Sequence, residues 1–268
     1  MGQIALTGLC IILDPDVRRR WIGTALLVTG LAAVMMTGSR TSLIAFAAAA
    51  VLVTFLWARR NARRVFIFGI SFIVMIGCLE LVARLADPEA SPINSVLGLL
   101  ERPRDEGNIA ALTGRTDVWD TCIRIAMDHP LTGYGFESFW TPIRILEISS
   151  IHQWAINQAH SVYIEHLVSL GFIGLGLWCI LIFGSLGVSL RKYAIDRSPT
   201  TLWLAGIVVF CIVHGFNESI NMLPVFNGYL FIVVIAHLVL YRKPRSVRVP
   251  RATFLSHTAH IDAPRFVA

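Results

Sequence analysis

The sequence predicts an all-α membrane protein that crosses the bilayer several times. Of its 268 residues, 55% are hydrophobic and only 15% are charged, against about 25% charged residues in ordinary soluble domains. The mean hydropathy is +0.66, and the apolar residues form long stretches that carry almost no charge. These observations argue against a soluble globular enzyme, and against a disordered chain, which needs low hydropathy and high charge.

Six stretches are predicted to span the membrane as helices, because a spanning helix needs roughly 17–25 apolar residues. The six are residues 21–37, 41–58, 65–79, 167–190, 201–213 and 222–241. The stretches 65–79 and 201–213 are short, and apolar residues extend them to Leu85 and Phe216. The apolar stretch 3–13 is too short to span, so we expect it to be the end of a further, truncated helix.

The basic residues predict the orientation of these helices. Arginine and lysine cluster at residues 18–20, 59–64, 191–197 and 242–251. An even number of crossings separates each cluster from the one before, so all four lie on one side, which the positive-inside rule makes the cytoplasm. The net charge of +6 is therefore a topology signal, and nucleic acid is a poor candidate partner.

The predicted organisation has four parts. Membrane helices occupy residues 1–85, a periplasmic loop with helices of its own occupies 86–160, membrane helices follow at 161–241, and a basic cytoplasmic tail occupies 242–268. Within the loop, Thr116 can cap a helix whose first turn contains Asp117 and Asp120, where the helix dipole favours negative charge. Apolar residues recur at helical spacing from residue 118 to residue 126.

Two further features of the loop follow this helix. Gly133 and Gly135 predict a turn over residues 131–139, because glycine adopts backbone angles that other residues avoid. The segment 140–154 is apolar enough to lie on the membrane surface.

Two arginines are candidate anion ligands. Arg40 lies in a tight hairpin, residues 37–42, between two apolar stretches. An arginine beside hydrocarbon must pair or reach the interface, so it is either an interfacial anchor or a phosphate site that uses its planar guanidinium group. Arg115, beside the expected helix start, forms either a surface salt bridge to Asp117 or Glu106, or a second phosphate contact next to the free N–H groups of the helix.

Further ionisable residues lie where the loop and the next hairpin meet the membrane. His160 can exchange a proton near neutral pH, or it is a capping or interfacial histidine. Glu165 and His166, one to two turns further on, either orient His160 or line the helix bundle. Glu218 either pairs with an arginine or a substrate hydroxyl, or is simply part of a turn at a helix end.

The sequence contains no motif for a cofactor. There is no P-loop, no GxGxxG and no CxxC pair, and the five cysteines are scattered. The acidic residues of the external loop are dispersed rather than clustered as the oxygen ligands of a divalent cation would be. We therefore expect neither a cofactor nor a metal ion.

Four segments together resemble the O-antigen ligase/polymerase family of bacterial membrane glycosyltransferases. They are TGSRTSLIAF at 37–46, GRTDVWDTCIRIAMDHPLTGYGFESFW at 114–140, AHSVYIEHLVSLGFIGL at 159–175 and FNES at 216–219. They occur in the family's order, and the second is most similar to the exopolysaccharide polymerase branch. Ser161 stands where the family usually has asparagine. The resemblance implies that the chain is the C-terminal portion of a longer protein.

The resemblance also implies a function. Family members act in the bacterial inner membrane, at its periplasmic face, where they polymerise or ligate polysaccharide units without nucleotide or metal. The donor is a glycan on undecaprenyl diphosphate, and the acceptor is another glycan or a lipid-core sugar. Membrane lipid and other polysaccharide-export proteins are the further partners that it implies.

Four residues match the family's functional positions. Arg40 and Arg115 match its phosphate-binding arginines. His160 matches its candidate general base, and Glu218 matches an acidic position. Two alternatives remain: a non-catalytic assembly subunit, and a transporter or flippase for lipid-linked saccharides, which predicts inverted repeats that we do not find.

Overall fold

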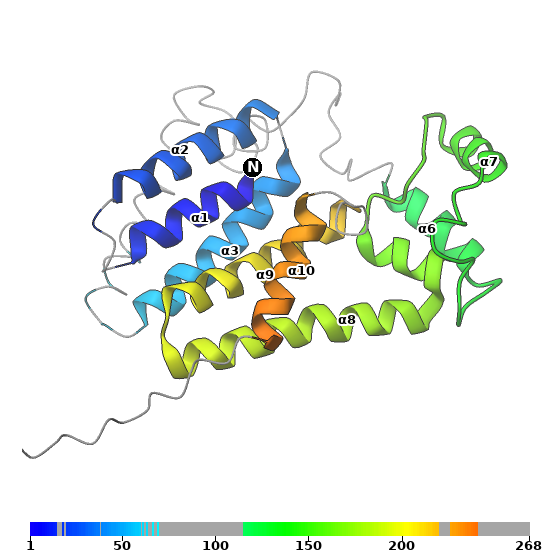
Figure 1. Cartoon of the computed structure of the whole chain (residues 1–268). Helices are drawn as coiled ribbons and strands as arrows, with labels where there is room; N and C mark the ends of the chain where they lie inside the picture. The colour runs from blue at the N-terminus through cyan, green and yellow to red at the C-terminus, as the bar shows by residue number, and fades with distance from the viewer. Residues whose placement is uncertain are drawn as a thin grey trace, which may run out of the picture.

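The computed structural model describes residues 1–14, 18, 20–37, 39–59, 61, 63, 66, 69, 115–219 and 226–240. Every regular element within these ranges is an α-helix (Figure 1). The helices are α1 (Gly2–Leu13), α2 (Arg20–Thr37), α3 (Arg40–Ala58), α6 (Arg115–Ala126), α7 (Pro142–His152), α8 (Val162–Asp196), α9 (Pro199–Asn217) and α10 (Phe226–Leu240).

Among the described residues, α2, α3, α8 and α9 are long and apolar enough to cross a membrane, and α1 and α10 are shorter apolar helices. The predicted spans 21–37, 41–58, 167–190 and 201–213 correspond to the four long helices, and 222–241 corresponds to α10. The predicted span 65–79, apart from Phe66 and Gly69, lies outside the described residues, as do residues 86–114 and the tail 242–268. The protein is thus an all-α polytopic membrane protein, as its sequence predicts.

Hydrogen bonds at both ends of the bundle show that α1, α3 and α8 run in one direction and that α9 runs in the opposite direction. At one end, Trp57 Nε1 donates to the carbonyl of Leu13 over 2.9 Å, and the Tyr193 hydroxyl donates to the carbonyl of Leu56 over 3.3 Å. We call this the basic end, because Arg59 and the arginine and lysine that precede Tyr193 lie beside it.

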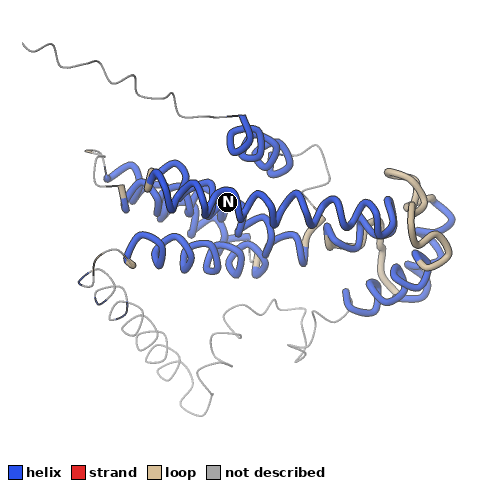
Figure 2. Tube along the Cα trace, turned by 90° about the horizontal axis from the view of Figure 1, so that it is seen from below, coloured by secondary structure: helices blue, strands red, loops and turns tan. Residues whose placement is uncertain are grey.

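At the opposite end, α3 begins, α9 ends and α8 begins. Ser42 Oγ lies 3.3 Å from Nε2 of His214, and the Tyr163 hydroxyl donates to the carbonyl of Ile212 over 3.2 Å. We call this the site end. The helices α6 and α7 gather around the first turns of α8, away from α1 to α3 (Figure 1), and Figure 2 shows the loops between them at that extremity.

The segment from α6 to the start of α8 has a hydrophobic core of its own. Its buried members come from α6, α7 and the loops around it, and the first turns of α8; they include Val118, Cys122, Phe139, Ile148, Ile156 and Val168. Most of the expected apolar face of α6 is therefore buried, while Ile123 of that face is exposed. The expectation that Thr116 caps this helix is wrong, because α6 already includes Arg115, although Asp117 does lie in its first turn.

A break in α8 joins this segment to the bundle. Gly171 has φ 66° and ψ −165°, angles that only glycine adopts without strain. The break leaves the carbonyls of Val168 and Ser169 and the amides of Phe172 and Ile173 without helical partners.

The turn that follows α6 supplies those partners. The amides of Tyr134 and Gly135 donate to the carbonyls of Val168 and Ser169 over 3.0 and 2.8 Å. In return, the amides of Phe172 and Ile173 donate to the carbonyls of Pro130 and Leu131 over 2.7 and 3.3 Å. The expected turn glycines Gly133 and Gly135 both have positive φ, 64° and 100°.

The contact between the turn and α8 has no room for a side chain. A Cβ atom added to Gly133 would lie 2.5 Å from the backbone of Ser169, and one added to Gly171 would lie 2.3 Å from the backbone of Leu131. The two glycines therefore allow two backbones to touch, which fixes the turn against the first part of α8.

We predict that Gly171→Ala loosens this junction. The substitution adds a Cβ in contact with backbone and forces a strained φ, at a cost of about 1–3 kcal/mol. Hydrogen exchange of the protein in lipid nanodiscs should show roughly 10-fold or greater loss of protection at the Tyr134 and Gly135 amides.

The control is Gly176→Ala in the same helix, where an added Cβ would meet nothing within 4 Å. We expect this variant to exchange as the unchanged protein does. Equal protection of the turn in both variants would contradict the proposed role of the break.

Candidate functional site

Arg115 and Glu218, both singled out from the sequence, form an ion pair at the site end. Arg115 Nη2 lies 3.5 Å from Glu218 Oε1, and Nη1 donates to the backbone carbonyl of Asn217. Both side chains keep some exposure, 30% and 24%. The partner of Arg115 within the described residues is thus Glu218 and not Asp117, and Glu106 lies outside them. The end of α9 thereby holds the first residue of α6.

Arg40 begins α3 at the same end of the bundle. Ser39 caps this helix, since its side chain accepts a hydrogen bond from the amide of Ser42. Ser42 in turn contacts His214, which lies one turn before the Asn217 carbonyl that binds Arg115. The contacts between α3 and α9 therefore bring the start of the Arg40 helix close to the partners of Arg115.

His160 is half-buried in the loop between α7 and α8. The side-chain amide of Gln158 lies 3.4 Å from its Nδ1, and the ring of Trp154 lies 6.0 Å away between centroids. Burial, and then the positive charge of Arg115, lower the pKa of His160 below its ordinary value. The imidazole is therefore neutral near pH 7. Ser161, rather than His160, occupies the N-cap position of α8.

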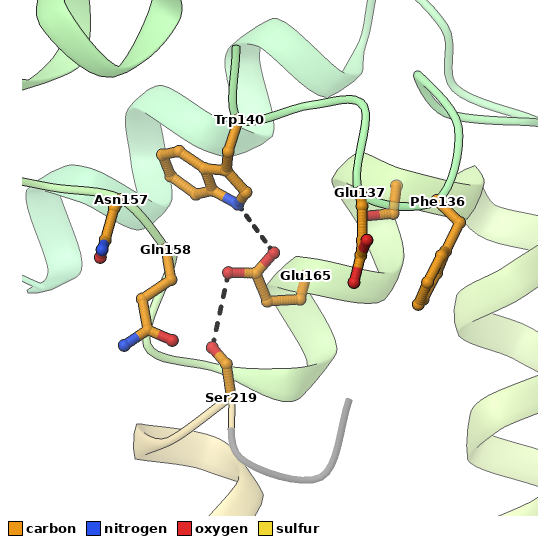
Figure 3. A pocket seen from close by; sticks show the side chains of 8 residues that line it. Phe136, Glu137, Trp140, Asn157, Gln158, Glu165 and Ser219 are labelled. Atoms are coloured by element: carbon orange, nitrogen blue, oxygen red, sulfur yellow. Dashed lines mark hydrogen bonds between the residues drawn. The ribbon is translucent and has the colours of Figure 1, made fainter. Parts of the chain in front are cut away.

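Glu165 is the buried centre of the site. Its carboxyl group accepts hydrogen bonds from Trp140 Nε1 at 2.9 Å and from the Ser219 hydroxyl at 3.5 Å (Figure 3). It also accepts one from the Ala159 amide at 2.5 Å. These donors come from three separate segments: the turn before α7, the loop before α8 and the residues after α9. Through the Ala159 amide, Glu165 also holds the backbone next to His160.

His166 has a different environment from His160. Its Nδ1 lies 2.7 Å from the carbonyl of Val162, and its ring stacks on Trp178 with 4.6 Å between centroids. Trp178 in turn packs against Phe231 of α10. Of the two roles considered from the sequence for His166, lining of the bundle is the one that these contacts favour.

A cavity of about 290 Å³ opens beside Glu165. Its wall combines aromatic, amide and carboxyl side chains (Figure 3): Phe136, Glu137, Trp140, Asn157, Gln158 and Glu165. The serines Ser169 and Ser219 complete it. The sequence reasoning missed most of these residues. The signal present in the sequence was the Asn157–Gln158 pair, two amides directly before the candidate histidine.

No group of three His, Cys, Asp or Glu side chains within the described ranges is placed to hold a metal ion. The ionisable side chains that the fold brings together are those of Arg115, Glu218, His160 and Glu165. The start of α3 lies close by. This arrangement offers a cationic fork, a neutral imidazole and a buried hydrogen-bond acceptor within one region.

Two comparisons with known proteins agree with one another. A family model described as O-antigen ligase matches residues 25–179. The exopolysaccharide production protein ExoQ of Rhizobium meliloti (strain 1021) is 29% identical over 172 residues, which are 62% of this chain and 38% of that protein. The chain thus spans well under half of the length of this relative. Because the matched family model covers more than half of the chain, the protein belongs to the O-antigen ligase family.

Proposed function

We propose that the protein takes part in polysaccharide biosynthesis as a glycosyltransferase of the inner membrane. It transfers a glycan from undecaprenyl diphosphate to an acceptor hydroxyl at the periplasmic face, in a polymerisation or ligation step. Family membership and the likeness to ExoQ support polysaccharide biosynthesis. The observation that carries the chemistry is the meeting of Arg115, Glu218 and the neutral His160 at the site end of the bundle.

Two helix starts supply the anion site in this proposal. Arg40 and Arg115 are the first residues of α3 and α6, and the first turns of a helix have free amides that favour phosphate. A guanidinium group adds two parallel donors for phosphate oxygens. Glu218 and the Asn217 carbonyl fix the orientation of the Arg115 fork.

His160 is the proposed general base. The acceptor oxygen forms a bond to the anomeric carbon of the donor while the bond from that carbon to the diphosphate breaks. The electron pair leaves with the diphosphate, and the proton of the acceptor hydroxyl passes to His160. Gln158 supports this role by orienting the ring, because its side-chain amide nitrogen lies 3.4 Å from Nδ1 of His160.

The direct test is transfer by the purified protein in lipid nanodiscs. A polyprenyl-diphosphate-linked glycan and an acceptor glycan are supplied with EDTA and without nucleotide, and product length is read on a gel. Elongated or ligated product supports the proposal. Transfer that needs added Mg²⁺ or a nucleotide sugar would contradict it.

The orientation is tested by labelling. We predict that Asp105→Cys, in the proposed periplasmic loop, reacts with an impermeant maleimide on intact spheroplasts. A cysteine introduced at Arg63, beyond the basic end, should react only after permeabilisation, because the positive-inside rule places it in the cytoplasm. The reverse pattern would put the site on the wrong side for a periplasmic donor.

The anion site is tested by Arg115→Lys. Lysine keeps the positive charge but loses the bidentate fork, so we expect turnover to fall about 10²–10³-fold, as when one preorganised donor to a developing oxyanion is removed. Arg124→Lys is the control, because Arg124 pairs with Asp120 on the exposed face of the same helix. Turnover that stays normal in Arg115→Lys would leave this arginine only a structural role.

The general base is tested by pH and by His160→Ala. Only the neutral imidazole accepts a proton, and burial with Arg115 keeps the pKa of His160 below its ordinary value. Activity should therefore be retained at pH 7 and fall as the pH drops below about 6.5. His160→Ala should abolish transfer, and with it this fall in activity at low pH, while leaving donor binding intact. The exposed His129, replaced by alanine, is the matched control.

A further inference from the structure

The cavity beside Glu165 is lined by carboxyl and uncharged polar side chains. Its eight described lining residues include two glutamates, two amides and two serines, and no arginine or lysine is among them. Arg115 lies outside this set and is engaged by Glu218 and Asn217, and Arg144, which donates to the carbonyl of Phe139, is not in the lining either. Among the described residues, a phosphate group in this cavity would meet carboxyl groups and no lining cation, which is unfavourable. The cavity is therefore separate in chemistry from the anion site.

The lining suits an uncharged polyhydroxylated ring. Asn157 and Gln158 each offer a donor and an acceptor, and carboxyl oxygens accept hydrogen bonds from hydroxyl groups. Trp140 and Phe136 supply aromatic surface for the apolar C–H face of a ring (Figure 3). A volume of about 290 Å³ gives room for a single sugar ring, with few polar groups placed around apolar surface, as in ligand pockets generally.

Hydrogen bonds hold the Glu165 carboxyl group in a position where it can accept a hydrogen bond from a sugar hydroxyl. It is only 6% exposed, and the hydrogen bonds from Trp140, Ala159 and Ser219 fix its carboxyl group at the wall of the cavity. Glu137, which comes from the turn before α7, lines the same cavity and lies beside Glu165 in the view of Figure 3. Its φ of 56° is a left-handed angle that non-glycine residues seldom adopt, and His160, next to the cavity wall, has φ 52°.

The position of His160 next to the cavity indicates whether the donor or the acceptor sugar binds there. Gln158 lines the cavity and also contacts Nδ1 of His160, so a ring bound here presents its hydroxyl groups next to the proposed base. The sugar that must lose a proton is the acceptor. The donor sugar, in contrast, is tied to a diphosphate that requires the arginines.

We propose that this cavity is the acceptor subsite and that it binds the terminal, uncharged sugar ring of the acceptor glycan. The assignment of the ring to the acceptor rests on the proposed function. The cavity selects against uronic acids and phosphorylated sugars, because Glu137 and Glu165 repel their negative charge.

Sugar binding can be measured without donor, so it is independent of turnover. The protein is placed in nanodiscs free of sugar detergents. Saturation-transfer NMR is recorded with methyl β-glycosides of glucose, galactose, mannose, rhamnose and N-acetylglucosamine, and with the uronates of glucose and galactose. We expect at least one neutral glycoside to bind and both uronates to bind at least 10-fold more weakly than their neutral counterparts.

Three variants of exposed lining residues locate the binding. Asn157→Ala and Phe136→Ala should weaken the neutral glycoside at least fivefold, and Glu137→Gln should reduce the discrimination against uronates. Glu147→Gln is the matched control, because Glu147 is an exposed glutamate on α7 outside the cavity. Circular dichroism checks that each variant keeps its helix content.

The outcomes separate the two proposals. Three results would each overturn the proposed subsite. The first is that no neutral glycoside binds, and the second is that binding is unchanged in both Asn157→Ala and Phe136→Ala. The third is that the uronates bind as well as the neutral sugars. If the subsite variants behave as expected while the transfer assay yields no product, the proposed function fails and a neutral-sugar site remains. If transfer occurs and the subsite variants raise no acceptor KM, the subsite alone fails.

Discussion

The structure depends on one exchange of backbone hydrogen bonds. Helix α8 is interrupted at Gly171, and the four peptide groups freed there pair with the turn that follows α6. A membrane-spanning helix normally satisfies its own backbone groups, because lipid offers no partners. Here the partners come from a neighbouring segment of the same chain. The break can therefore exist only while the turn is docked, and the turn is positioned only while the break exists.

Glu165 extends this junction into the site. It lies on the short part of α8 before the break. Its three hydrogen-bond donors come from three segments, which lie 6, 25 and 54 residues away along the chain. A buried carboxyl group is costly unless it is well hydrogen-bonded. Satisfying Glu165 therefore brings Trp140, the loop before His160 and the segment after α9 to one point. The geometry of the candidate site thus follows from the requirement that the buried Glu165 carboxyl group be hydrogen-bonded.

The helices could be predicted from hydropathy because a helix that crosses a membrane must be apolar along its length, whether or not it is buried inside the protein. The candidate residues Arg115, Glu218 and His160 could be named because charged or titratable side chains stand out beside apolar stretches. Pairing with an arginine was one of the roles expected for Glu218, but which arginine could not be predicted. Arg115 had nearer acidic residues along the chain, and only the fold, which brings the start of α6 to the end of α9, selects Glu218. The break at Gly171 could not be predicted for a similar reason. A glycine in an apolar stretch is also typical of close packing between helices, and only the structure shows that the backbone of the turn contacts it.

The contact between Arg115 and the end of α9 also has a consequence for the order of synthesis. Its partner, the Asn217 carbonyl, follows 102 residues later in the chain. During translation, α6 therefore leaves the ribosome long before its partner is made, and α8 and α9 must both be inserted before the arginine is oriented. A nascent or prematurely terminated chain has the arginine but not its oriented fork. Orientation of Arg115 is thus a late event in biogenesis, coupled to completion of the membrane bundle.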